Sequence, residues 1–307
     1  MKNVDCYICG KNDATTLFPG NMSDSDLRPE HIAARQGAIN KEFMYNWVRC
    51  NTCGLVYVNP VPDKEKLERL YAESDQRAYT DEVDNLSKTY CKYLYRYGKH
   101  LTRRGTALDI GAGSGFFLKA LKEFGFQNVT GLEPSVSACA SAPDDLRGLI
   151  KNTSFDERDF VPGSMDFISC MQTLEHVFFP NQLIDSLARV LADNGLVYIV
   201  THNFGAIGVK IFGARHPIVN AGHLALFDEK TLRKLLEKKF DVIDVFKISN
   251  RYSLKYWTSL FPMNPKLKSV LTKVLEKTRL ASIPLTLSMG NIGIIARKSP
   301  KKEEAPQ

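Results

Sequence analysis

The chain has 307 residues, of which 44% are hydrophobic and 24% charged, and its formal net charge is +7. A chain of this length has room for one domain of about 200 residues with smaller additions, since single domains commonly contain roughly 100–200 residues. No apolar run reaches the roughly 18 residues of a membrane span, and the start, MKNVDCYICGKND, lacks the apolar core of a secretory signal. The composition therefore argues against a membrane-spanning protein, and we expect a cytoplasmic location.

The positive charge is concentrated near the C-terminus. Residues 247–307 contain twelve Lys and Arg against three Glu, so the remainder of the chain is slightly acidic. A basic surface of this kind can bind an anionic substrate, a carrier or a membrane surface, or it can be an ordinary solvated face.

Two cysteine pairs lie in the first part of the chain. Cys6 and Cys9 form one Cys-x-x-Cys, Cys50 and Cys53 form another, and a glycine follows each second cysteine. Four thiolates suit a closed tetrahedral Zn²⁺ site, which is a structural site. A redox-active pair would need a thioredoxin-like βαβ setting, which neither pair has. We therefore predict a small zinc-ribbon-like module at residues 1–60.

The sequence pattern divides the rest of the chain into four segments. Residues 61–104 are expected to form a helical connector or lid. Within 105–250, apolar strands alternate with amphipathic helices, which indicates parallel βαβ units with helices on both faces of the sheet. A basic helical region and a final strand follow at 251–298. Residues 299–307 lack apolar side chains and are expected to be disordered.

Individual elements of the α/β region follow from apolar periodicity. Asp228 is a suitable N-cap for a helix at 229–239, with Phe227 and Leu232 placed as a hydrophobic staple. A second helix begins near Pro180 and ends before Gly195. Strands are predicted at 106–110, 127–133, 196–200, 241–248 and 291–297.

A glycine-rich turn follows the first of these strands. The segment ALDIGAGSGFFLKAL places Asp109 at the end of the strand, before Gly111, Gly113 and Gly115. Glycines are needed where the backbone takes unusual angles or where a ligand approaches the main chain closely. In an NAD-binding turn the third glycine would come one residue later. Glu133 ends the next strand, where a carboxylate can accept hydrogen bonds from both ribose hydroxyls, so the pattern predicts a nucleoside site.

Four segments, DIGAGSG, GLEPS, MDFISCMQTLEHVFFP and RVLADNGLVYIV, occur in the order and spacing of a known family. Over roughly residues 104–247 the chain resembles class I S-adenosylmethionine-dependent methyltransferases, which implies a Rossmann-like sheet and S-adenosyl-L-methionine as cofactor. For Met171, core packing is the alternative to a cofactor contact. The resemblance places around the cofactor Asp109, Gly111, Ala112, Gly113, Gly115, Glu133, Pro134, Phe155, Met171 and Gln172.

The combination of this domain with a cysteine knuckle resembles a narrower group of methyltransferases. Members with this layout, including sugar C-methyltransferases of deoxysugar pathways, usually act on small molecules or carrier-linked metabolites. Those sugar enzymes carry a further domain after the methyltransferase domain, for which we expect no room in 307 residues. The resemblance implies a small-molecule or carrier-linked acceptor and leaves sugar C-methylation in question.

Two histidines are candidates for a general base. A hydroxyl or activated C–H acceptor must lose a proton, and imidazole suits that task. His176, in QTLEHV, follows the fourth strand at the edge that carries the glycine turn, and His202 lies near the same rim. His223, in AGHLALFDEKTL, stands where similar methyltransferases often place an HLxxF element over the substrate pocket. The alternatives are a helix-entry pair of Glu175 with His176, and a capping or packing role for His223.

The basic C-terminal region contains an amphipathic helix. We expect its apolar face to dock on protein, as a lid or a dimer contact, with peripheral contact to an anionic membrane as the alternative. The apolar face comprises Leu267, Val270, Leu271, Val274 and Leu275, and the lysines elsewhere on the helix are Lys266, Lys268, Lys273 and Lys277.

Three functional hypotheses remain open. The leading one is methyl transfer to oxygen or carbon of a small-molecule or carrier-linked acceptor in saccharide or secondary metabolism. The second is an RNA methyltransferase, although residues 1–60 have nearly balanced charge and so no basic footprint for phosphates. The third is a non-catalytic nucleoside-binding module. NADH binding would instead indicate a dehydrogenase.

Overall fold

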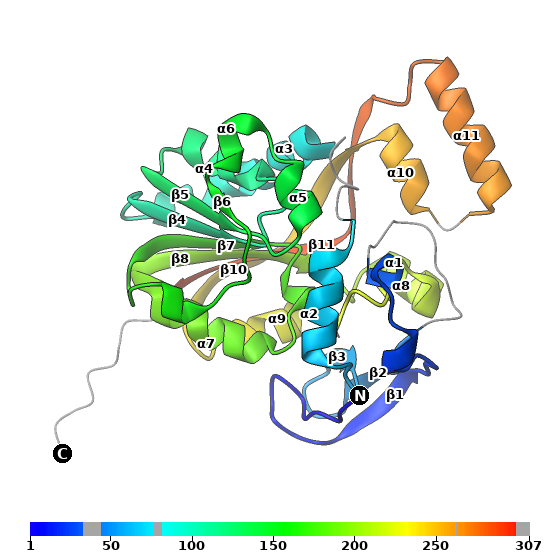
Figure 1. The fold of residues 1–307 in the computed structure, drawn as a ribbon, viewed down its shortest axis with the longest axis horizontal. Helices are drawn as coiled ribbons and strands as arrows, with labels where there is room; N and C mark the ends of the chain where they lie inside the picture. Colours follow the sequence, from blue (N-terminus) through cyan, green and yellow to red (C-terminus); the bar gives the residue numbers. More distant parts are fainter. Residues whose placement is uncertain (33–43, 76–81, 262, 299–307) are drawn as a thin grey trace.

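The structure is a computed structural model that describes residues 1–32, 44–75, 82–261 and 263–298. Its strands form two sheets (Figure 1). The larger sheet has seven strands in the order β10 (Phe240–Ser253), β11 (Pro284–Lys298), β8 (Leu191–His202), β7 (Met165–Met171), β4 (Thr106–Ile110), β5 (Asn128–Leu132) and β6 (Ile150–Lys151). The smaller sheet has the order β1 (Ala14–Phe18), β2 (Trp47–Cys50), β3 (Val56–Val58) and β9 (Ala225–Leu226).

The larger sheet is mixed. Strands β4 to β8 run parallel, whereas β11 is antiparallel to β8 and β10 is antiparallel to β11. Asn291 of β11 lies opposite His202 at the carboxyl end of β8. The preceding residues of β11 therefore extend beyond that end, where residues 284–287 pair with β10. The predicted α/β sheet is confirmed, but its last two strands are longer than the apolar pattern indicated.

Helices cover both faces of the larger sheet, as predicted. On one face, α7 (Pro180–Val190) and α9 (Glu229–Leu236) pack on side chains that include Leu108 and Ile110. On the other, α3 (Val83–Tyr97) and α4 (Phe116–Phe124) pack on side chains that include Ala107. Successive residues of a strand point to opposite faces, so β4 supplies both cores. Both layers are visible in Figure 1.

The remaining helices are short or peripheral. The N-cap predicted for α9 is confirmed, since the side chain of Asp228 accepts a hydrogen bond from the Thr231 backbone N–H. Residues 299–307, expected to be disordered, lie outside the described residues. The α-helices not yet given are α1 (Pro29–Ile32), α2 (Lys64–Glu73), α5 (Val136–Ala140), α6 (Asp144–Arg147), α8 (Ile207–Phe212), α10 (Leu254–Leu260) and α11 (Pro265–Lys277). The 3-10 helices are η1 (Asp24–Asp26), η3 (Gly98–His100), η4 (Glu157–Asp159), η5 (Leu174–His176) and η6 (Gly213–Arg215).

The smaller sheet joins the N-terminal segment to the α/β domain. Strands β1 to β3 come from the N-terminal segment, but the fourth strand, β9, comes from the segment after β8. Tyr57 pairs with Ala225, and the Val58 N–H donates to the Leu224 carbonyl at 2.9 Å. The two segments also share a buried apolar cluster that includes Trp47. The sequence pattern did not predict that β9 would join the sheet of the N-terminal segment.

No helix within these described ranges combines the length and the apolar character that a bilayer crossing requires.

Candidate functional site

The glycine turn between β4 and α4 has left-handed backbone angles at three positions. The φ angles of Gly111, Gly113 and Gly115 are 73°, 55° and 84°. A Cβ on Gly111 would lie 2.1 Å from Oγ1 of Thr173, so this glycine allows the turn to pack against the end of β7. A Cβ on Gly113 would meet no described heavy atom within 4 Å. Gly113 therefore leaves the main chain open to a ligand.

Asp109 is completely buried at the end of β4. Its Oδ1 accepts a hydrogen bond from Ser169 Oγ at 2.6 Å, while Oδ2 has no hydrogen-bond partner among the described residues. Burial raises the pKa of this carboxyl to about 7. A buried acceptor without a partner costs free energy, which a cationic donor such as a ligand ammonium group would offset.

Glu133 follows β5 and is also buried. Its Oε2 accepts from the Gly113 N–H at 2.9 Å and its Oε1 from the Ser135 N–H at 2.8 Å. Burial raises the pKa of this carboxyl as well. Each oxygen has a second lone pair, so both can also accept from ligand hydroxyls. The carboxylate thus links the glycine turn to the position predicted for a ribose.

The other predicted cofactor residues surround the same edge of the sheet. The Ala112 N–H donates to the Leu132 carbonyl, and the Pro134 carbonyl accepts from Asn152 Nδ2 at 3.0 Å. Phe155 stacks on Phe160, with ring centroids 5.7 Å apart. These contacts hold the segments after β5 and β6 in place.

Met171 and Gln172, at the end of β7, differ in burial and in backbone conformation. Met171 is buried in the apolar cluster that includes side chains of α3 and α4. Gln172 has a φ of 55°, an uncommon angle for a residue other than glycine, and its Nε2 donates to Tyr90 Oη at 3.4 Å. Such backbone strain is often retained at functional sites, and this one lies at the carboxyl end of β7.

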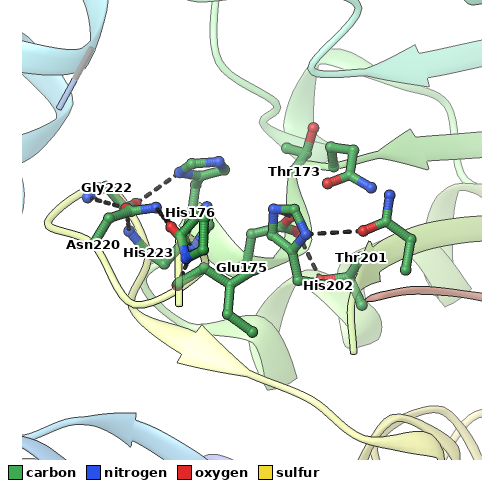
Figure 2. A network of polar contacts seen from close by, with 12 residues as sticks. Thr173, Glu175, His176, Thr201, His202, Asn220, Gly222 and His223 are labelled. Atoms are coloured by element: carbon green, nitrogen blue, oxygen red, sulfur yellow. Dashed lines mark hydrogen bonds and ion pairs between the residues drawn. The ribbon is translucent and has the colours of Figure 1, made fainter. Parts of the chain in front are cut away.

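Three histidines meet beyond the carboxyl ends of β7 and β8 (Figure 2). The ring centroids of His176 and His223 are 4.7 Å apart, and those of His202 and His223 are 4.9 Å apart. Each Nδ1 lies beside an oxygen acceptor, so we assign the proton to Nδ1 and a free lone pair to Nε2. The acceptors are the Gly222 carbonyl for His176 at 2.7 Å, the Ile218 carbonyl for His223 at 2.7 Å, and Asn291 Oδ1 for His202 at 2.9 Å.

Glu175 is completely buried next to these rings. Its Oε2 accepts from Thr201 Oγ1 at 2.8 Å, and its Oε1 lies 3.5 Å from Nε2 of His202. Burial raises the pKa of Glu175 and lowers that of His202 to about 4, so both groups favour their neutral forms.

The two predicted catalytic histidines lie side by side but differ in accessibility. His223 is buried, whereas His176 is half-buried and its ring lies 5.8 Å from that of Tyr71. Burial lowers the pKa of both histidines, further for His223, and two neighbouring rings contribute to that shift. His176 is therefore neutral near pH 7 and is the better placed of the two to reach an acceptor.

The four cysteines come together at the tip of the N-terminal segment. Sγ of Cys6 lies 3.3 Å from that of Cys53, Sγ of Cys9 lies 3.5 Å from that of Cys50, and all four sulfurs lie within 4.8 Å of one another. None forms a disulfide. Four thiolates around one Zn²⁺ at about 2.3 Å would be roughly 3.8 Å apart, so the cluster fits the ion. The glycines that follow each pair have φ angles of 70° and 87°, as tight turns require.

A second group could also hold a metal. One ligand atom each from Glu175, His176 and His223 lie within 4.8 Å of one another. Two imidazoles and one carboxylate form the ligand set of several catalytic zinc and iron sites. The structure thus brings His223 next to His176 and Glu175, which the sequence analysis considered as a pair apart from His223. It adds Ser169, Thr201 and Asn291, whose long-range partners no local pattern indicates.

Comparisons with known proteins agree with this geometry. The family model described as "Methyltransferase domain" matches residues 77–241, more than half of the chain. Ubiquinone biosynthesis O-methyltransferase of Shewanella halifaxensis is 34% identical over 117 residues, which cover 36% of this chain and 49% of that protein. The same-named protein of Paraburkholderia xenovorans is 30% identical over 133 residues, 38% of this chain and 56% of that protein. The chain spans about half the length of the curated relatives it matches.

Solved structures show the same fold. A chain from the complex of the Haloferax volcanii Trm112 methyltransferase activator with a methyltransferase matches with a TM-score of 0.50 at 15% sequence identity. The match covers 76% of this chain and 100% of that chain. The glycine turn, the buried acid after β5 and the family match over residues 77–241 lead to one conclusion: the chain belongs to the methyltransferase domain family.

Proposed function

We propose that this protein transfers a methyl group from S-adenosylmethionine to an oxygen or carbon atom of a small-molecule or carrier-linked acceptor, in saccharide or secondary metabolism. The observation that carries the proposal is one edge of the sheet. It presents an unpartnered buried oxygen of Asp109, an open main chain at Gly113 and a second buried acid, Glu133, next to a neutral His176.

These residues fit the cofactor. Asp109 Oδ2 would accept from the ammonium group of its methionine portion, and Glu133 would accept from the ribose hydroxyls. Gly113 lets the ligand approach the backbone, because no side chain fills the space there. When bound, S-adenosylmethionine supplies an electrophilic methyl carbon attached to a sulfonium centre.

The histidine cluster serves the acceptor. The Gly222 carbonyl fixes the tautomer and orientation of His176, so that Nε2 can take a proton from an acceptor hydroxyl. His223 packs edge-on against that ring and acts as a positioning residue, while Glu175 contacts Thr201 and His202. Holding the acceptor in line with the methyl carbon, with the reacting atoms about 3–3.5 Å apart, contributes much of the acceleration. The names of the related proteins favour oxygen as the methylated atom.

The four cysteines are proposed to bind a structural Zn²⁺. All four ligand positions are protein thiolates, so the site is closed to substrate. Its role is to fix the two N-terminal turns beside β2 and β3. Strand β3 in turn pairs with β9, two residues after His223, so the zinc module supports the segment that carries this histidine.

Calorimetry tests the cofactor assignment. The protein should bind S-adenosylmethionine and S-adenosylhomocysteine, and failure to bind either would refute the methyltransferase proposal. Turnover is then measured as release of S-adenosylhomocysteine with panels of phenols and glycosides. Binding without turnover on any acceptor would favour the non-catalytic nucleoside-binding module.

His176→Ala tests the base. We expect turnover to fall by about 100-fold or more while cofactor affinity changes less than about twofold, because general-base catalysis typically contributes at least that factor. His100→Ala is the matched control, since the His100 side chain forms no hydrogen bond or ion pair among the described residues and its backbone carbonyl accepts from Arg297. Unchanged turnover would remove His176 from the reaction. A strict requirement for an added divalent metal would make it a metal ligand.

A further inference from the structure

Exposed apolar side chains are concentrated between β10 and β11. Residues 254–285, here called the C-terminal excursion, comprise α10, α11, the turn after them and the first residues of β11. Of the fifteen exposed large apolar side chains among the described residues, eight lie in this excursion. A concentration of this kind on a folded protein usually marks an interaction surface. Figure 1 shows α10 and α11 standing outward at the end of the β10–β11 ribbon.

Helix α11 does not use its apolar stripe to pack on the chain. The stripe consists of Leu267, Val270, Leu271 and Val274, which are 37–60% exposed and share one helix face by their spacing. The less exposed side of α11 is a different one, formed by Lys268, Thr272 and Leu275. There Lys268 Nζ donates to the Ser259 carbonyl of α10 at 2.8 Å. The expectation that the stripe docks as a lid on the same chain is therefore wrong for the described residues.

The charges around the stripe have one sign. Lys266, Lys273 and Lys277 flank it on one side by helical position, and Lys268 flanks it on the other. The only acidic residue of the excursion is Glu276, which forms an ion pair with Lys255 at 2.8 Å. A two-fold contact between copies would place these lysines against each other. Anionic headgroups would pair with them while the stripe enters the apolar layer.

The excursion stands on the edge of the sheet that carries the histidines. Asn291 of β11 lies opposite His202 at the carboxyl end of β8, and the chain from residue 290 back to 284 continues past that end. The same edge carries Asp109, Glu133 and His176. A surface bound by the excursion would therefore lie on the acceptor side of the molecule.

We infer that the C-terminal excursion docks on an anionic lipid surface. The apolar stripe of α11 enters the boundary between headgroups and acyl chains, and the flanking lysines bind the headgroups. This inference does not depend on methyl transfer, because it rests on the exposure and charge of α11.

Vesicle flotation of the full chain tests the inference. The protein should bind vesicles of phosphatidylcholine mixed with phosphatidylglycerol, bind phosphatidylcholine alone weakly, and dissociate at high salt. Lys273→Glu/Lys277→Glu should weaken binding by about 30-fold or more, since each basic residue at an anionic surface strengthens binding about fivefold. Leu271→Glu should weaken it by about tenfold or more, because it removes part of the inserted apolar area.

Lys230→Glu/Lys234→Glu on α9 is the matched control, with the same charge change on two other exposed helix residues. It should retain most of the binding. Equal losses in both pairs, or no binding of the unmodified protein, would overturn the inference. A dimer in sedimentation that Leu271→Glu dissociates would assign the stripe to a second copy instead. Cofactor affinity measured on the same variants should be unchanged, which separates failure of this inference from failure of the proposed function.

Discussion

The N-terminal cysteine module and the C-terminal excursion are both additions to the α/β domain, but they are attached in different ways. The module shares a sheet with the α/β domain through β9, and its large aromatic side chains Tyr45 and Trp47 are fully buried. The excursion is held at its two ends by β10 and β11, and α11 has no buried residue. The module shares a sheet with the domain and is therefore part of its fold. The excursion is attached only at its two ends, so the surface of α11 stays exposed to solvent.

The largest expected effect is at the cysteine cluster. Cys50→Ser removes one of four proposed ligands and should abolish bound zinc and lower the free energy of unfolding by several kcal/mol, because metal binding is coupled to folding of its ligands. Zinc content by elemental analysis and thermal unfolding measure both. Cys139→Ser, at a half-buried cysteine outside the cluster, should retain the zinc. A protein purified under reducing conditions without zinc would contradict the proposed site.

The next largest effect is expected at β9, the strand that joins the α/β domain to the sheet of the N-terminal segment. Leu226→Ala in β9 truncates a buried side chain and should lower the free energy of unfolding by about 2–5 kcal/mol, since such truncations leave cavities. Turnover should fall as well, because His223 precedes β9 closely, while zinc is retained. Urea unfolding and elemental analysis report the two outcomes. A stability loss without any change in turnover would separate the module from the histidine cluster.

An intermediate effect is expected in the seven-stranded sheet. Burial raises the pKa of Asp109 from 3.8 to about 7, so the folded state favours its protonated form. The stability that this group contributes is present at low pH and is lost as pH rises toward 7. The free energy of unfolding of the unmodified protein minus that of Asp109→Asn should fall by about 2.5 kcal/mol between about pH 5 and pH 8.

The difference in unfolding free energy between the unmodified protein and Asp109→Asn does not contain the contribution of His202, which is the same in both proteins. The pKa of His202 is lowered to about 4, so its stabilisation is lost on acidification. Denaturant unfolding at the two pH values measures the difference. A difference that does not vary with pH would show that Asp109 ionises normally. Affinity for S-adenosylmethionine should also rise through this pH range in the unmodified protein, and should not in Asp109→Asn.

The smallest effect is expected in the excursion. Leu271→Ala makes the same substitution as Leu226→Ala, but at an exposed position of α11. It should change the free energy of unfolding by less than about 0.5 kcal/mol, as exposed substitutions usually do. Urea unfolding of the two variants in parallel makes the comparison direct. A loss of more than about 1 kcal/mol would mean that the stripe is covered in solution.

The sequence predicted those features that depend on neighbouring residues. The glycine spacing and the acid at Glu133 indicated the cofactor edge, and the Cys-x-x-Cys spacing predicted which sulfurs would meet, as Cys6 and Cys53 do. The N-cap at Asp228 followed from the same local chemistry. Such signals survive in the sequence because the glycine turn, each Cys-x-x-Cys pair and the N-cap are each contained within a few consecutive residues.

Other features depend on register between distant strands, which no local pattern encodes. Ser169 donates to Asp109 because β7 pairs with β4 in one particular register. His202 and Asn291 meet because β11 runs antiparallel to β8. A shift of one residue would turn each side chain to the opposite face. The sequence also did not show that the stripe of α11 is exposed. Amphipathic periodicity indicates that a helix face is apolar, but it does not indicate what covers that face.

The pairing of β3 with β9 also has a consequence for biosynthesis. The hairpin of β2 and β3 is synthesised long before β9, the strand that completes its sheet, because Tyr57 pairs with Ala225, which is 168 residues later in the chain. During that interval the outer edge of β3 has backbone groups without partners, which can pair wrongly with other strands. The proposed zinc site needs only residues up to Cys53, so a bound Zn²⁺ would hold this hairpin in shape until residues 225–226 have been synthesised.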